Sequence, residues 1–191
     1  MPAEMTRTTT WTVDPTHTEI GFRVRHMMVS WTKGRFRAFS GTVTLDEAHP
    51  ERSRIDVTID AASVETGLAP RDEHLRSADF FDVEHHPRIT FRSTCMRKVG
   101  ESAFEVAGDL AIRGIVRPVT LEVEGLGPAV VDPWGATRRG AQARGTVDRK
   151  EFGLVWNGAL EAGGVLVGDE VRIELEVGLI QAAAQDAKQA A

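Results

Sequence analysis

Residues 71–87 hold the densest group of side chains that could bind a metal ion or transfer protons. Three histidines, three aspartates and two glutamates fall within these seventeen residues. Two ligands on one helix lie three or four residues apart, but a serine and an alanine occupy those positions after His74. His85 and His86 are adjacent, so in an extended segment before a proline their side chains point in opposite directions. The spacing predicts no metal site, unless one of the two joins a ligand from elsewhere in the chain, and no cofactor is expected.

The same stretch has the pattern of a short helix that covers apolar surface. Asp72 is placed to cap the helix, and the glutamate after it suits the positive N-terminal end. Leu75, Ala78 and Phe81 recur along one stripe of such a helix. Residues 71–82 are therefore expected to form a helical lid or plug between the third and fourth strands of a sheet.

His26 is the histidine with the clearest functional potential. Alternation places it with Phe22 and Val24 on the presumed inner face of a strand. A buried imidazole needs a hydrogen-bond partner, which a ligand's polar head, a backbone carbonyl or Ser40 would supply. The general rule favours a partner within the protein.

The lone cysteine and the arginines near residue 140 have weaker potential. Cys95 excludes an intramolecular disulfide and shares the alternation of Phe91, which predicts a small core residue rather than a nucleophile. The arginines of residues 137–150 would suit a phosphate head group. Their alternation along a strand favours a solvated face instead.

Alternation of apolar and polar residues runs through most of the chain and predicts strands with one buried face. Eight segments show it, at residues 20–27, 34–46, 54–60, 89–96, 104–112, 119–126, 137–147 and 171–179. In the second, Phe36 and Phe39 lie on opposite parities, which predicts a bulge. Because eight long strands joined by tight turns would expose two edges unless the sheet closed, we expect an all-β fold, an extended eight-stranded antiparallel up-and-down barrel.

The seventh segment indicates whether such a barrel would be hollow. Ala141, Ala143 and Gly145 share one parity, and if they point inward they leave space beside that strand. The alternative is that large neighbours such as Phe22 and Phe91 fill the gap. An eight-stranded barrel with space inside holds one small ligand.

Composition bounds the remaining possibilities. A net charge of −5 and a single cysteine argue against a nucleic-acid partner and are compatible with a reducing compartment. The first ten residues have no apolar core of a secretory signal, and no apolar run is long enough to span a bilayer. We expect residues 1–10 to be a flexible segment, residues 11–180 one barrel domain, and residues 181–191 a flexible tail rich in alanine and glutamine.

Six motifs in order carry a family resemblance from Trp11 to about Ile180. They are "WTVDPTHTEIGFRVRHMMVS", "GRFRAFSGTV", "RDEHLRSADFFDVEHHPRITF", "VAGDLAIRGIVRPVTLEVE", "DRKEFGLVWN" and "GGVLVGDEV". Together they resemble the YceI family of lipocalin-like proteins, with the third motif similar to its helical insertion and return strand. The resemblance implies an eight-stranded barrel, often dimeric, whose apolar tunnel holds a long amphipathic molecule, typically a polyisoprenoid.

The resemblance and the hollow together predict a protein that binds, stores or carries an amphipathic lipid, most simply a polyisoprenoid or isoprenoid-tailed molecule. We expect a homodimer without enzymatic activity in the cytoplasm, although many family members are periplasmic. The alternative is a small-molecule enzyme that uses the same pocket with His26 as acid or base. The candidate ligand-binding residues are Phe22, Val24, His26, Phe39, Phe91, Leu110, Ala141, Ala143 and Trp156.

Overall fold

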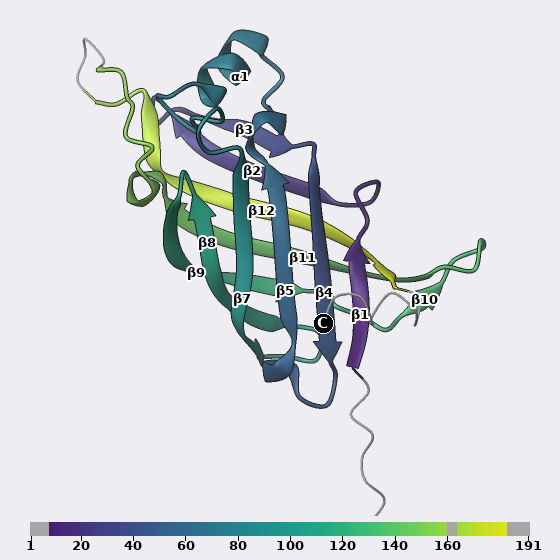
Figure 1. Cartoon of the computed structure of the whole chain (residues 1–191). Coiled ribbons are helices and arrows are strands. Elements are labelled where there is room, and N and C mark those ends of the chain that lie inside the picture. Colours follow the sequence, from purple (N-terminus) through teal and green to yellow (C-terminus); the bar gives the residue numbers. More distant parts are fainter. Residues whose placement is uncertain (1–7, 160–163, 183–191) are drawn as a thin grey trace, which may run out of the picture.

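The computed structural model describes residues 8–159 and 164–182, and it is a β-barrel with one short helix at one end (Figure 1). The helical elements are α1 (Ala69–Arg76) and three 3-10 turns, η1 (Pro50–Arg52), η2 (Ala61–Ser63) and η3 (Arg149–Phe152). The strands are β1 (Thr8–Val13), β2 (Glu19–His26), β3 (Ser30–Phe36), β4 (Phe39–Asp46), β5 (Arg54–Asp60), β6 (Val64–Glu65), β7 (Arg88–Lys98), β8 (Phe104–Ile112), β9 (Ile115–Glu124), β10 (Val130–Val131), β11 (Thr137–Asp148) and β12 (Val167–Gln181).

The sheet closes into a ring because β11 pairs with both β9 and β12. β1 and β2 follow one another along the same edge of β12, and β4 and β3 pair with them in turn. β1 and β2 together therefore form one long strand with an interruption, and β3 and β4 form another. Counted in this way, the barrel has eight antiparallel strands in which neighbours in the chain are neighbours in the sheet, which confirms the expected architecture.

The predicted irregularity between Phe36 and Phe39 is the break between β3 and β4. Arg37 and Ala38 belong to neither strand. Because the break shifts the alternation, Phe36 is buried and Phe39 packs against the same core from the other parity. The long second strand can thus bend around the barrel without turning its apolar residues outward.

A bulge in β7 overturns the prediction for Cys95. The pairing register with β8 shifts between Ser93 and Cys95, which reverses the alternation from that point. Met96 consequently points into the core and Cys95 is exposed. The prediction that Cys95 is a core residue is wrong.

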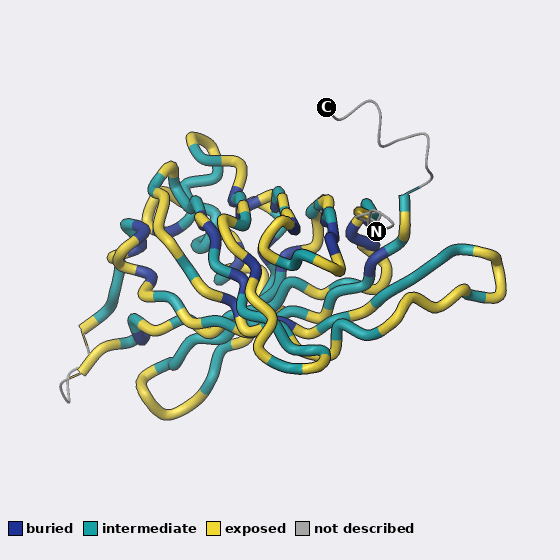
Figure 2. The backbone as a smooth tube through the Cα atoms, turned by 90° about the horizontal axis from the view of Figure 1, so that it is seen from below, coloured by how far each residue is buried: buried dark blue, intermediate teal, exposed yellow. Residues whose placement is uncertain are grey.

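Large side chains lie over glycines on neighbouring strands. A Cβ on Gly34 would lie 2.3 Å from the ring of Phe22, and one on Gly108 would lie 2.5 Å from the ring of Phe91. Glycine at these positions lets the aromatic rings approach the backbone of the adjacent strand, a device that supports strong sheet curvature. Figure 2 shows how buried and exposed residues alternate along the strands.

The ends of the chain only partly meet the predicted domain limits. Thr8–Thr10 belong to β1, so the barrel begins before residue 11, and Gln181 is the last residue of β12. The rest of the segments expected to be flexible, residues 1–7 and 183–191, lies outside the described residues. Within the described ranges, no helix is long and apolar enough to cross a membrane.

Candidate ligand-binding site

The segment around α1 covers one end of the barrel. The helix has Leu68 as its N-cap residue, without a side-chain hydrogen bond, and a proline in its first turn. Asp72, predicted to cap the helix, is buried and instead accepts hydrogen bonds from the backbone N–H and the hydroxyl of Thr66. Arg71 also donates to the Thr66 hydroxyl and carbonyl, at 2.7 and 2.9 Å. These bonds join the start of the helix to the chain that leads into it.

An aromatic cluster seats this lid on the barrel. Phe80 is only 6% exposed, and its ring centroid lies 5.1 Å from that of His74 and 5.4 Å from that of Trp156. Leu75 and Phe81 pack against the core, as expected, but both are only partly buried. The helix ends at Arg76, six residues before the predicted limit, so Phe80 reaches the core from a turn rather than from the helical stripe.

Two of the three histidines in residues 71–87 contact a nearby carboxylate. His74 Nε2 lies 2.8 Å from Asp79 Oδ2, and His85 Nδ1 lies 2.9 Å from Asp82 Oδ1. The hydrogen bond to Asp82 raises the pKa of His85 above its ordinary value. Among the residues that the structure describes, no three side chains of histidine, cysteine, aspartate or glutamate come together as a metal site.

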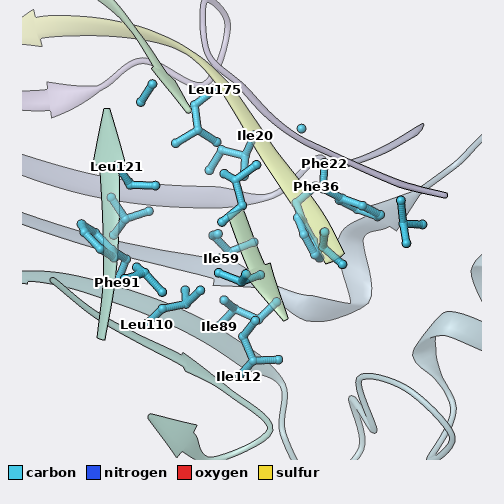
Figure 3. A pocket seen from close by; sticks show the side chains of 18 of the residues that line it. Ile20, Phe22, Phe36, Ile59, Ile89, Phe91, Leu110, Ile112, Leu121 and Leu175 are labelled. Carbon is cyan, nitrogen blue, oxygen red and sulfur yellow. The ribbon is translucent and has the colours of Figure 1, made fainter. Parts of the chain in front are cut away.

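A cavity of about 640 Å³ occupies the barrel interior beneath this lid (Figure 3). Val167 and Leu179, near opposite ends of β12, both line it, and at about 3.3 Å per residue they are about 40 Å apart along the strand. The cavity is therefore long as well as apolar. Its walls in Figure 3 are formed by Ile20, Phe22, Phe36, Ile59, Ile89, Phe91, Leu110, Ile112, Leu121 and Leu175.

The structure brings most of the predicted ligand-binding residues to this cavity. Phe39 is the exception, since it packs against the core without lining the cavity. The lining residues from the predicted set are Phe22, Val24, His26, Phe91, Leu110, Ala141, Ala143 and Trp156.

The hollow beside β11 is shorter than the run of small residues indicated. Ala141 and Ala143 line the cavity. A Cβ on Gly145, however, would lie 2.7 Å from Cδ2 of Leu121, so the Leu121 side chain occupies the space next to that glycine. The cavity is therefore open at the alanines, while Leu121, rather than Phe22 or Phe91, fills the place beside the glycine.

Polar side chains contribute to the cavity wall mainly at the lid end. His26 lies there at the end of β2, and Arg71 and His74 approach from the lid. The imidazole of His26 has no hydrogen-bond partner among the described residues. Ser40, one of the partners that the sequence suggested for it, is exposed. The cavity thus has an apolar length and a polar, partly cationic end.

Arg149 is a buried residue whose role the sequence did not indicate. Its guanidinium donates hydrogen bonds to the carbonyls of Leu154, Trp156 and Gly168, the last two at 2.9 Å. Burial lowers the pKa of Arg149, while the nearby Asp169 carboxylate opposes that shift. Arg149 therefore holds the segment carrying Trp156 against the start of β12. Its guanidinium donates to backbone carbonyls of the protein rather than to a phosphate group.

The arginines at the other end of β11 are also paired within the protein. Arg138 forms ion pairs with Asp14 and Asp132, and Arg139 with Glu47. Asp14 is buried, which by itself raises its pKa, but hydrogen bonds from Thr16, His17 and Arg138 outweigh burial and hold the pKa of Asp14 below its ordinary range. This network fixes the corner between β1 and β2 to β11, far from the lid.

Comparisons with known proteins agree with this architecture. Protein YceI of Escherichia coli and of Shigella flexneri is 42% identical over 138 residues, 72% of this chain and 71% of that protein. Burkholderia cenocepacia BcnA has a TM-score of 0.73 at 26% identity, covering 87% of this chain and 98% of its own. A polyisoprenoid-binding domain from Saccharophagus degradans, implicated in plant cell wall breakdown, has a TM-score of 0.66 at 17% identity, covering 91% and 99% of the two chains.

The match to a family model covers nearly the whole barrel. The model described as a YceI-like domain matches residues 11–179, from β1 to the last residues of β12. The order of motifs, the closed eight-stranded ring and the identity to proteins named YceI point to one family. The chain belongs to the YceI family.

Proposed function

We propose that this protein binds a long amphipathic lipid, with the hydrocarbon tail inside the barrel and the polar head at the lid end. The observation that carries the proposal is the cavity of about 640 Å³, which every long strand of the ring helps to line. Its volume lies in the range of small-molecule sites. Its lining follows β12 from Val167 to Leu179, and a cavity that runs along a strand suits a chain-like ligand better than a compact one.

The chemistry of the walls supports this orientation of the ligand. Aliphatic and aromatic side chains line the length of the cavity, and burying each methylene there contributes about 0.8 kcal/mol before association costs. His26, Arg71 and His74 stand at the lid end and offer hydrogen-bond donors to a polar head. A ligand with a head at one end of a long tail satisfies both parts at once.

An isoprenoid tail is the specific candidate. The structural neighbour from Saccharophagus degradans is described as a polyisoprenoid-binding domain, and its fold is shared along most of this chain. Methyl branches along such a tail would fill a cavity whose walls are uneven, with aromatic rings at Phe22 and Phe91 and small side chains at Ala141 and Ala143.

The enzymatic alternative would need His26 to act with a second group. Its imidazole lines the cavity, but no carboxylate or hydroxyl of the described residues is hydrogen-bonded to it. General acid or base catalysis by histidine usually depends on such an orienting partner. Binding therefore accounts for the cavity with fewer requirements than catalysis does.

Length dependence of binding tests the proposal. The protein is stripped of bound lipid and titrated with isoprenoid alcohols of increasing chain length, and tryptophan fluorescence or calorimetry reports the affinity. We expect the affinity to rise with each added five-carbon unit until the cavity is full, and then to level off. Binding that is weak and independent of length would overturn the proposal.

A further inference from the structure

The turn between β2 and β3 has an unfavourable sequence for its backbone conformation. Met27 and Met28 have φ values of 53° and 58°, and the N–H of Val29 donates to the carbonyl of His26 at 3.0 Å. This is the geometry of a type I′ turn, in which asparagine and glycine are strongly preferred because both central residues have positive φ. Two methionines in this conformation are strained, and strain of this kind concentrates at functional positions.

These residues present apolar side chains to solvent. Met28 is 63% exposed and Val29 is 81% exposed, and Met27 is exposed as well. The tip, defined as Met27, Met28 and Val29, is tied to the chain before β12, because the N–H of Met27 donates to the carbonyl of Leu166 at 2.8 Å. Val165, next to that contact, is also exposed. The strained backbone thus holds a small apolar projection in place.

A group of basic side chains lies beside the tip, on the outer face of β2, β3 and β12. The guanidiniums of Arg25, Arg172 and Arg23 lie 4.2, 4.8 and 5.0 Å from the ring centroid of Trp31. Lys33 is the pairing partner of Arg23 across the β2–β3 ladder and is exposed. We call these four cations and Trp31 the basic patch.

The basic patch keeps a net positive charge although the whole chain carries a net charge of −5. Glu174 pairs with Arg23, and Glu170 pairs with Arg172. Arg25 and Lys33 have no carboxylate within ion-pair distance among the described residues. Tryptophan and arginine beside an exposed apolar projection are typical of surfaces that lie at a membrane interface.

The position of the tip connects this surface with the cavity. His26, directly before the tip, and Leu166, which is hydrogen-bonded to it, both contribute to the cavity lining. Leu68 of the lid lines the cavity and is also exposed, which indicates that the cavity reaches the surface at this end.

We propose that the tip and the basic patch dock this protein on the surface of an anionic lipid bilayer. The methionines and Val29 enter the interface between headgroups and acyl chains, and the basic patch contacts the negatively charged headgroups. This surface brings the lid end of the cavity to the membrane, and in that respect the inference rests on the proposed function. Docking itself depends only on the tip and the basic patch.

Vesicle binding tests the proposal with a variant that separates docking from folding. Met27→Asn together with Met28→Gly removes the apolar side chains and installs the sequence that a type I′ turn prefers. We expect this variant to be more stable, with a Tm about 2–4 °C higher. In co-sedimentation with vesicles of phosphatidylcholine and phosphatidylglycerol, it should bind about tenfold more weakly than the natural protein.

The charge requirement has its own variants and conditions. Arg25→Gln and Lys33→Gln should each weaken binding to the mixed vesicles about fivefold, and raised salt should do the same. The natural protein should bind vesicles of phosphatidylcholine alone much more weakly. Equal binding to both vesicle types would contradict the role of the basic patch.

A second exposed apolar surface provides the matched control. Val130 and Val131 are exposed on the hairpin arm that β10 forms with the start of β11 (Figure 1), and this arm adjoins the C-terminal end of β12, opposite the tip. Val130→Ser with Val131→Ser should leave vesicle binding unchanged. If that pair removes binding and the tip variant does not, or if the natural protein fails to bind anionic vesicles, the proposal is wrong. Association of copies through the tip, seen as a dimer that the tip variant abolishes without any vesicle binding, would also overturn it.

Loading from detergent separates this inference from the proposed function. The Met27→Asn, Met28→Gly variant should take up an isoprenoid alcohol from detergent as well as the natural protein does, but more slowly from vesicles. If the natural protein binds vesicles through the tip yet takes up no isoprenoid from either source, docking stands and the proposed ligand fails. If uptake occurs equally from detergent and from vesicles in both proteins, docking fails and the cavity ligand stands.

Discussion

Replacing Ala143 by phenylalanine should block part of the lipid tail while leaving the empty barrel folded. Ala143 lies in β11 between Val123 of β9 and Leu175 of β12, and its side chain lines the cavity. A phenyl ring at this position projects into space that only a ligand fills. The ring and the tail cannot occupy that space together.

The magnitude follows from the carbon atoms that the ring excludes. If the ring displaces one five-carbon isoprenoid unit, the loss is about 4 kcal/mol at about 0.8 kcal/mol for each buried carbon. That loss corresponds to roughly a thousandfold weaker Kd. A tail that shifts sideways rather than leaving the cavity retains part of this energy, so the expected weakening is between about tenfold and a thousandfold.

The assay measures Kd for a long isoprenoid alcohol and the Tm of lipid-free protein for the same set of variants. Gln142→Phe is the matched control, because Gln142 is the neighbour of Ala143 in β11 and is exposed on the outer face. We expect that control to bind like the natural protein. The Tm of lipid-free Ala143→Phe should match the natural value, because the ring enters open space.

Overpacking is the outcome that would refute this reasoning. Forcing a ring into a filled core costs typically 1–3 kcal/mol, which corresponds to a Tm lower by about 2–12 °C for a domain of this size. If lipid-free Ala143→Phe shows that loss, and its Kd for the lipid is unchanged, the space beside β11 is not where the tail lies.

Three further predictions concern the lid and the far end of the barrel. Phe80→Ala should lower the free energy of unfolding by about 3–5 kcal/mol and Phe81→Ala by less, since Phe81 is only partly buried; urea denaturation measures both, and the reverse order would contradict the described seating of the lid. Asp14→Asn should destabilise the protein by about 1–3 kcal/mol near neutral pH. Because hydrogen bonds hold the folded-state pKa of Asp14 below its ordinary value, the natural carboxylate stabilises the fold above the ordinary carboxyl pKa and loses that effect as pH falls through the folded-state pKa; the difference between the two proteins should therefore shrink in acid, and a difference constant across pH would argue against this account. Replacing His85 and His86 together by alanine should leave metal content and lipid uptake unchanged, and stoichiometric zinc in the natural protein that this double variant lacks, by elemental analysis, would show a metal site instead.

The barrel was predictable because its main determinant is local. Strict alternation over segments such as residues 171–179 marks one buried face, and eight such segments with short connections leave closure as the way to remove sheet edges. The break near Phe36 was visible for the same reason, since two large apolar residues on opposite parities require a shift of the strand.

The errors arose where pairing or packing across the chain overrides alternation. The bulge opposite Gly108 reverses the faces of β7, and nothing local distinguishes Cys95 from the core residues before it except that Met96, the larger apolar residue, follows. Asp72 has the composition of a helix cap, but its actual partner is Thr66, six residues earlier.

The sequence predicted many of the residues that line the cavity, but not the residues that fill the space beside it or hold its end in place. Small residues at Ala141 and Ala143 marked open space, but that Leu121 fills the place beside Gly145 depends on the register of β9 and β11. Arg149 looked like one arginine of a basic run, and its burial depends on carbonyls that the segment after η3 and the start of β12 bring together. Phe80 was overlooked because the helix was expected to continue past it.

Analysis of the lipid bound to protein purified from its native host, without detergent, tests the central claim most directly. Solvent extraction followed by mass spectrometry gives both the identity of the lipid and its molar ratio to the chain. The account predicts one molecule per barrel with a long hydrocarbon tail, of isoprenoid type, and much less in Ala143→Phe than in Gln142→Phe. The account would be contradicted if the protein carried no lipid from its host and took up none from a lipid extract. Equal amounts of bound lipid in Ala143→Phe and in the natural protein would contradict it as well.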